Sequence, residues 1–238
     1  MDDLEQRAID FIKKNKKLLI EKFASLEKYA PVTDPLTFFM AGSPGAGKTE
    51  YSKGFIENLQ AEQPGIKIVR IDPDEIRKII PGYIGSNSWQ VQKAVCFGVE
   101  PLLDHVLHKN LNFVLDGTFS NYEKSKNNIE RCLRRKRRVG IIYIYLKPEV
   151  AWSFTKKREK LEGRPVPLEA FVNDFFLAKE NVQKMKEEFG SQIHVSLVIK
   201  DNEGTVKKTP FEVDKIDSYI DKKYTKEELE DLISNITI

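Results

Sequence analysis

A glycine-rich segment at residues 42–49 carries the strongest chemical signal in the sequence. In the pattern G-x-x-x-x-G-K-[ST], glycines let the backbone turn tightly with its amide hydrogens facing phosphate oxygens, and the following helix adds its positive end. Lys48 is expected to reach the β- and γ-phosphates, and Thr49 to bind Mg²⁺. The pattern therefore predicts a phosphate-binding loop (P-loop) for ATP and Mg²⁺. It is matched in full by Gly42-Ser43-Pro44-Gly45-Ala46-Gly47-Lys48-Thr49.

A P-loop alone does not separate kinases from GTPases, motors or switches. The sequence has no N-K-x-D guanine signature and no second catalytic apparatus of the motor type. Its 238 residues suit a small-molecule or nucleotide kinase.

Three carboxylates follow predicted strands. Asp72 and Asp74 come after the apolar segment 66–71, and Asp116 comes after 111–115. In an open parallel sheet the carboxyl ends of the strands form the ligand crevice, so these side chains are expected to face the γ-phosphate. There they could accept the proton of an attacking hydroxyl, bind Mg²⁺ or cap a helix. Asp72 precedes Pro73, so a helix N-cap is its alternative role, whereas Asp116 suits the magnesium side.

Two basic segments have different interpretations. Residues 156–165 follow the fourth predicted strand, and Arg158 and Arg164 there could neutralise a transferred phosphoryl group from a mobile lid. The alternative is a solvated helix face. In the run 131–138 six of eight residues are basic, at a helix end opposite the P-loop edge. We expect that run to face solvent, with a patch for nucleic acid or an acidic partner as the alternative.

Composition excludes several classes. The 39 Lys and Arg against 36 Asp and Glu give a net charge of +3, which does not favour a nucleic-acid-coating protein. Cys96 and Cys132 belong to no metal-binding pattern and imply a reducing compartment. His105 and His108 share a helix without metal-ligand neighbours and are expected to be structural. An acidic N-terminus and the lack of a long apolar stretch predict a cytoplasmic protein without a membrane segment.

The elements that position these residues alternate between strand and helix. Strands are predicted at 36–41, 66–71, 111–115, 139–146 and 193–200, with a hairpin return at 205–208. Helices are predicted at 3–30, 49–60, 74–80, 88–109, 121–136, 149–162, 168–189 and 213–222, and a last one opens with a capping box at Thr225 and Glu228. This order predicts an α/β fold with a five-stranded parallel sheet and helices on both faces. We expect one domain over 1–238, with an N-terminal helix (1–31), a core (36–200) and a hairpin with C-terminal helices (201–238).

Over residues 36–200 the sequence resembles the zeta toxin family of P-loop kinases. The shared pattern comprises the P-loop, an Asp72-x-Asp74-x-x-Arg77 segment, a helical Glu100, Asp116-Gly117-Thr118, Arg158 and an arginine followed by Pro-x-Pro at Arg164. Each piece after the P-loop is short, and their order and spacing carry the resemblance.

The resemblance implies transfer of the γ-phosphoryl group of ATP to a sugar hydroxyl, with the 3′-hydroxyl of UDP-N-acetylglucosamine as the family's best-known acceptor. It implies that Asp74 is the general base and that Lys48, Arg158 and Arg164 clamp the phosphates. It places Asp72, Arg77, Glu100 and Thr118 at the substrate, and a small antitoxin is the partner expected in toxin systems.

Two positions depart from the family pattern. Family members often have His-Pro where Ile80-Pro81 stands, and a basic residue where Ser120 stands. Both positions border the substrate side. A kinase acting on an antibiotic, another metabolite or a polynucleotide end, and a non-enzymatic ATP switch, remain the alternatives.

Overall fold

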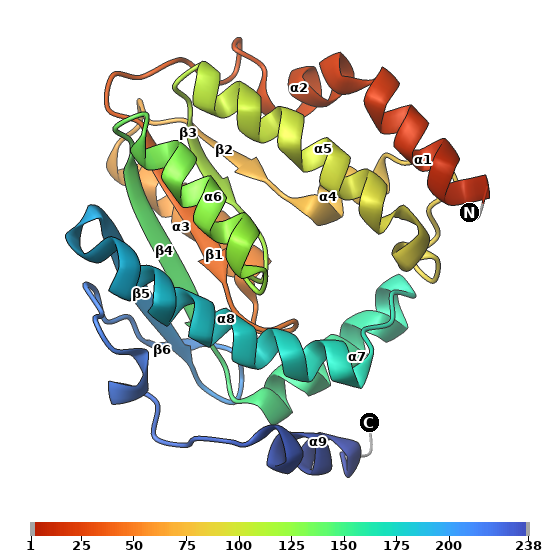
Figure 1. Ribbon diagram of the computed structural model, residues 1–238, viewed down its shortest axis with the longest axis vertical. Helices are drawn as coiled ribbons and strands as arrows, with labels where there is room; N and C mark the ends of the chain where they lie inside the picture. The colour runs from red at the N-terminus through yellow and green to blue at the C-terminus, as the bar shows by residue number, and fades with distance from the viewer. Residues whose placement is uncertain (1–2, 237–238) are drawn as a thin grey trace.

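The computed structural model describes residues 3–236, and helices and strands alternate along most of them (Figure 1). The strands are β1 Leu36–Ala41, β2 Ile68–Ile71, β3 Asn112–Leu115, β4 Arg138–Tyr145, β5 Ile193–Lys200 and β6 Val206–Lys208. The α-helices are α1 Asp3–Lys14, α2 Lys16–Ala24, α3 Lys48–Glu62, α4 Pro73–Lys78, α5 Ser88–His108, α6 Tyr122–Leu133, α7 Pro148–Glu162, α8 Leu168–Phe189 and α9 Lys226–Ser234. The ends of the predicted domain, residues 1–2 and 237–238, lie outside the described part.

The six strands form one sheet in the order β2-β3-β1-β4-β5-β6. The first five pair in parallel, as predicted, and β6 returns antiparallel to β5 as the predicted hairpin. The strand that leads into the P-loop, β1, lies between β3 and β4. Because β1, β2 and β3 are parallel, the loops after their carboxyl ends meet at one edge of the sheet.

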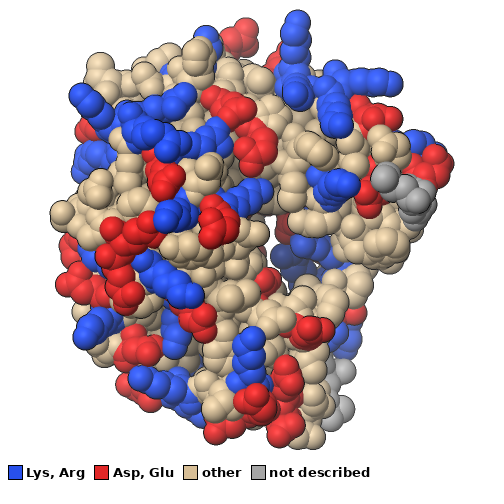
Figure 2. Space-filling view, viewed as in Figure 1, with Lys and Arg blue, Asp and Glu red and all other residues tan. Residues whose placement is uncertain are grey.

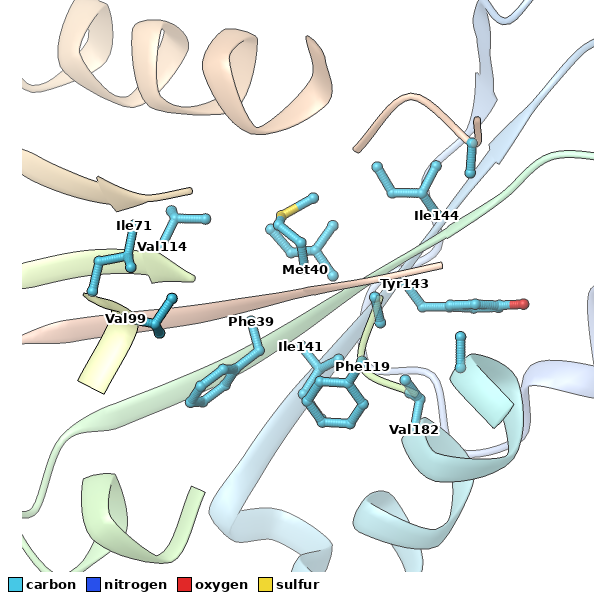
Figure 3. Packing of buried hydrophobic residues seen from close by; sticks show 14 of the residues in the cluster. Phe39, Met40, Ile71, Val99, Val114, Phe119, Ile141, Tyr143, Ile144 and Val182 are labelled. Carbon is cyan, nitrogen blue, oxygen red and sulfur yellow. The ribbon is translucent and has the colours of Figure 1, made fainter. Parts of the chain in front are cut away.

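Apolar side chains from both faces of the sheet are covered by helices. Phe38 contacts Phe55 of α3 with ring centroids 4.9 Å apart, while its neighbour Phe39 contacts Phe113 and Phe119 on the opposite face. Figure 3 shows the same division, with Met40 and Ile144 on one side of the strands and Phe39, Ile141 and Val182 on the other. This two-sided burial explains why the strands are continuous apolar runs rather than alternating ones.

The N-terminal segment is two helices, so the predicted single helix over 3–30 is wrong. The interruption is Asn15, whose side chain donates a hydrogen bond of 2.8 Å to the carbonyl of Phe11. Asparagine competes in this way with the backbone bonds of a helix. The second helix ends at Ala24, before Ser25 in extended conformation. Both helices pack on α5 and bury Ala8, Ile12 and Leu19, whereas Leu18 and Leu26 of the same apolar pattern are exposed.

The helix predicted at 213–222 is also absent. The segment contains a short 3-10 turn at Ile216–Ser218, and the amide of Val213 donates to the carbonyl of Val195 in β5. Val213, Ile216 and Ile220 are buried. Their helical spacing therefore identified buried residues, although the segment forms no continuous helix. The capping box at Thr225 and Glu228 is confirmed at the start of α9.

The basic run 131–138 divides into exposed and buried members. The predicted solvent exposure holds for the side chains of Arg134, Arg135, Lys136 and Arg138. It is wrong for Arg137, which is 3% exposed. Its guanidinium donates to Thr37 Oγ1 at 2.7 Å and to the carbonyl of Leu111 at 2.5 Å.

Arg137 therefore connects the starts of β1, β3 and β4. Its guanidinium also lies 5.0 Å from the ring centroid of Phe113. Burial lowers its pKa to about 10. The run is opposite the P-loop edge, as expected, because β4 begins at Arg138.

His105 has the structural role expected of it. Its Nε2 atom lies 3.0 Å from the carbonyl oxygen of Ala24, which connects α5 to the end of α2. Among residues 3–236, no helix combines the length and the apolar character needed to cross a membrane.

Candidate active site

The P-loop connects β1 to α3, which begins at Lys48. Gly42, Gly45 and Gly47 all have positive φ, at 139°, 73° and 78°. A Cβ on Gly45 would lie 2.0 Å from the carbonyl oxygen of Ala151, so the loop touches the lid helix α7. Glycine is required here by backbone conformation and by close approach, and the result is a cradle at the start of α3.

Lys48 lies inside this cradle. Its Nζ atom donates to the carbonyls of Gly42 at 2.9 Å and Ser43 at 2.7 Å. Burial lowers its pKa, and the nearby carboxylates of Asp116 and Asp174 act in the opposite direction. A partly buried ammonium with carboxylates around it is suited to take phosphate oxygens as partners.

Asp116 follows β3 and faces Ser52, one turn into α3. Its Oδ2 atom accepts from Ser52 Oγ at 3.2 Å and from Arg70 Nη1 at 2.9 Å. Burial raises the pKa of its carboxyl, with the charge of Asp72 adding to the effect. Thr49 is the second residue of α3.

A hydroxyl and a carboxylate at this place are the hard oxygen donors that Mg²⁺ takes when phosphate oxygens and water complete its shell. No group of three His, Cys, Asp or Glu side chains in residues 3–236 forms a metal cage of its own. The donor set therefore fits a magnesium ion that arrives with a nucleotide.

Asp72 is the N-cap of α4. Its Oδ1 atom accepts from the backbone amide of Asp74 at 2.8 Å, and its Oδ2 atom pairs with Arg70 at 2.7 Å. The structural alternative identified from Pro73 is thus present. Arg70 joins Asp72 to Asp116, and this connection fixes two carboxylates relative to each other.

Asp74 contacts three arginines. Its Oδ2 atom lies 2.5 Å from Arg158 Nη2, and its Oδ1 atom lies 2.5 Å from Arg164 Nη1 and also pairs with Arg77. The three cations come from α4, from α7 and from the connection after α7. Figure 2 shows a hollow on the side where α4 and α7 face each other, with basic side chains in its depth.

The electrostatics of this cluster keep Asp74 ionised. Burial alone would raise the pKa of its carboxyl, but Arg164, Arg158 and Arg77 together hold it well below its usual range. One carboxylate facing three guanidiniums leaves an excess of positive charge. That excess suits the oxygens of a phosphoryl group.

The other predicted substrate residues lie in two places. Thr118 lies beside the P-loop, because its carbonyl accepts from the amide of Gly42 at 3.1 Å. Glu100 is half-exposed on α5 and pairs with Arg131 and Lys124 of α6. Arg77 is buried against Asp74 and Gln92.

Sequence reasoning missed several residues of the site. Arg70 lies on β2, two residues before Asp72, and the alternation of a strand could have identified it as facing the same side. Ser52 lies one turn after Lys48 on the buried side of α3. Asp174 had no motif to identify it, because its position near the P-loop is set by tertiary packing, whereas Ser120 was identified only as a departure from the family pattern.

A mostly parallel sheet with a P-loop after its central strand and lid arginines opposite a strand-end acid defines the P-loop kinase-like class. The family model described as Zeta toxin matches residues 21–208 of this chain. The chain therefore belongs to the Zeta toxin family and is a kinase of that family.

Solved structures support the fold. One, from work on the PezAT chromosomal toxin–antitoxin system of the human pathogen Streptococcus pneumoniae, is 17% identical with a TM-score of 0.61, covering 100% of this chain and 90% of the other. A complex of AvrRxo1-ORF1 and AvrRxo1-ORF2 with sulphate ions is 18% identical with a TM-score of 0.61, covering 91% of this chain and 70% of the other.

A structure of the same pair with ATP is also 18% identical, with a TM-score of 0.59 and coverage of 87% of this chain and 65% of the other. No curated protein shows significant sequence similarity to this chain.

Proposed function

We propose that this protein transfers the γ-phosphoryl group of ATP to a sugar hydroxyl, with UDP-N-acetylglucosamine or a related nucleotide-linked metabolite as acceptor. The observation that carries this proposal is Asp74, which three arginines surround next to the P-loop lysine. A switch that only binds ATP has no use for a general base inside a cluster of phosphate-seeking cations.

Asp74 acts as the general base. The acceptor oxygen forms a bond to the γ-phosphorus, the bond from that phosphorus to the β,γ-bridging oxygen breaks, and ADP leaves. The hydroxyl proton passes to Asp74. Because Arg158 and Arg164 pair with Asp74 in the described structure, phosphate oxygens compete for the same guanidiniums. Their transfer to phosphate would raise the pKa of Asp74 and make it a stronger base.

The remaining roles follow from position. Lys48 and the backbone amides of the P-loop other than Gly42, which donates to Thr118, and Pro44, which has no N–H, bind the β- and γ-phosphates, while Arg158 and Arg164 stabilise the transferred group. Thr49 and Asp116 would hold Mg²⁺, which neutralises phosphate charge when bound. Asp72 orders α4 at the substrate side, and Arg77 orients Asp74.

The acceptor assignment and the partner rest on family membership. We assign both Thr118, which lies beside the P-loop, and Glu100, which lies on α5 and pairs with α6, to binding of the acceptor. A relative comes from the PezAT toxin–antitoxin system, and AvrRxo1-ORF1 is in complex with AvrRxo1-ORF2. We therefore propose that this protein acts as a toxin and that a small antitoxin covers its ATP site.

The test is a transfer assay with radiolabelled ATP against UDP-N-acetylglucosamine, other UDP-sugars, unrelated metabolites and oligonucleotides. We expect labelled product with the UDP-sugars and none with Lys48→Ala. Labelling of only another acceptor class would replace the sugar assignment. ATP binding without transfer to any acceptor would identify a switch instead of an enzyme.

A further inference from the structure

A second lysine contacts the P-loop, and it comes from β5. Lys200 is the last residue of that strand, and its Nζ atom donates to the carbonyl of Gly47 at 3.3 Å. A Cβ atom added to Gly47 would lie 2.2 Å from the same Nζ atom, so the ammonium packs directly on the loop backbone. The two residues are 153 positions apart in the chain, and the packing of the sheet brings them together.

The ammonium of Lys200 has few partners in the protein. Among residues 3–236 it forms no ion pair within 4 Å. Its hydrogen-bond acceptor, the carbonyl of Gly47, also accepts from the amide of Tyr51 at 3.1 Å. Burial lowers the pKa of Lys200, and the carboxylate of Glu50 acts in the opposite direction. An ammonium has three N–H donors, so this half-buried group retains donors for an anion.

The position of this charge is unfavourable for the helix that it contacts. Gly47 is the N-cap of α3, and the N-terminus of a helix carries the positive end of the helix dipole. Cations stabilise the opposite end of a helix, so Lys200 adds positive charge where α3 is already positive. A bound anion reverses this effect, because both the ammonium and the helix N-terminus stabilise negative charge between them.

Lys200 and the acids of the site approach the P-loop from opposite sides. The sheet order places β2 and β3, which precede Asp74 and Asp116, on one side of β1, and β5 on the other (Figure 1). The proposed function puts the transferred γ-phosphate with Lys48 and these acids. The phosphate on the Lys200 side is then the one that is attached to the nucleoside.

We propose that Lys200 binds the α-phosphate of ATP, so that the nucleotide lies along the edge of the sheet with its γ-phosphate toward β3 and its nucleoside toward β5. This inference rests on the proposed function, which gives the place of the γ-phosphate. It adds a nucleotide contact from outside both the P-loop pattern and the lid. Because no bond to the α-phosphate breaks in the transfer, Lys200 contributes to the affinity and the orientation of the nucleotide.

One variant and one control separate this role from a general effect of charge. Lys200→Gln removes the ammonium but keeps a long polar side chain. Lys207→Gln makes the same change of charge at an exposed position on β6. The measurements are the dissociation constants of ATP, ADP and the two diastereomers of ATPαS, in which sulphur replaces one α-phosphate oxygen, and the melting temperature of the nucleotide-free protein.

We expect Lys200→Gln to weaken the binding of ATP and of ADP by the same factor of about ten, the loss of one charge-assisted hydrogen bond. In the wild type, one ATPαS diastereomer should bind more weakly than ATP, because sulphur is the poorer acceptor. That difference should shrink in Lys200→Gln. The melting temperature should not fall, and Lys207→Gln should match the wild type throughout.

Unchanged ATP affinity in Lys200→Gln would overturn the inference. A loss for ATP without a loss for ADP would also overturn it, because that pattern belongs to a contact with the γ-phosphate. A lower melting temperature with unchanged affinity would show that Lys200 only joins β5 to the P-loop. If the wild type binds ATP but transfers phosphate to no acceptor, the proposed function fails. The titrations still judge Lys200 in that case, because they need no acceptor.

Discussion

Arg158 and Asp74 are 84 residues apart in the chain, yet Arg158 Nη2 lies 2.5 Å from Asp74 Oδ2. The contact joins the lid helix α7 to α4 across the hollow seen in Figure 2. Arg158 also pairs with Glu162 on its own helix. These two ion pairs hold the guanidinium in place. The conformational entropy of this long side chain is therefore lost on folding and not on phosphate binding.

Asp74→Asn should greatly reduce kcat while leaving ATP binding nearly intact. The amide keeps the shape of the side chain but cannot take up the proton of the acceptor hydroxyl, a loss of about 10²–10⁴ in rate for a general base. Single-turnover transfer and an ATP titration measure the two properties separately. An equal loss of transfer and of ATP binding would contradict the general-base role.

The same carboxylate should contribute to stability in a pH-dependent way. Because the arginines depress the pKa of Asp74 in the folded state, its stabilisation is fully present above the unfolded pKa of about 3.9 and is lost as pH falls towards the folded pKa. Wild type and Asp74→Asn should therefore differ more in urea-unfolding free energy at about pH 7 than at about pH 3.

The exposed Asp34 provides the control, since Asp34→Asn should change the unfolding free energy little at either pH. A difference between wild type and Asp74→Asn that does not shrink in acid would mean that the arginine contacts do not stabilise the folded state.

Arg137→Ala should destabilise the fold by about 3 kcal/mol, because it removes hydrogen bonds to Thr37 and Leu111 and leaves a buried void. Arg135→Ala, two positions earlier and exposed, should change stability by less than about 0.5 kcal/mol. Urea denaturation of both variants checks this. Equal effects would mean that the buried contacts of Arg137 carry no net stabilisation.

Cys132 should resist alkylation in the folded protein. It is fully buried, and burial raises the pKa of its thiol to about 11. Thiolate is the reactive form, so iodoacetamide at about pH 8 should modify Cys96, which is partly exposed, well before Cys132. Mass spectrometry of digested protein locates the label. Modification of Cys132 at the same rate would indicate that the C-terminal end of α6 opens readily.

The sequence predicted those parts of the site that local chemistry determines. Short-range patterns predicted the alternation of strands and helices, the glycines of the P-loop and the acids after β2 and β3. The structure brings the P-loop and these acids to one edge of the sheet. Arg137 shows where this reasoning ends. Nothing in the local sequence distinguishes Arg137, which is buried, from the exposed basic residues next to it. Its partners Thr37 and Leu111 are distant in sequence.

The same limit explains Asp174 and the C-terminal segment. Asp174 is one of several charged residues on a long helix, and its direction is set by how α8 packs on the loop after β3. Residues 213–222 have helical spacing, but the edge of β5 offers Val213 a backbone partner, and that pairing prevails over propensity.

The hydrogen bond from the amide of Gly42 to the carbonyl of Thr118 has a kinetic consequence. The peptide group of Gly42 belongs to the P-loop, which we expect to bind ATP. The peptide group of Thr118 belongs to the loop that we assign to the substrate that receives the phosphate. The amide proton of Gly42 can exchange with solvent deuterium only while the two loops are apart. Its exchange rate therefore measures how often the two halves of the site separate, and ligands that hold them together should slow it.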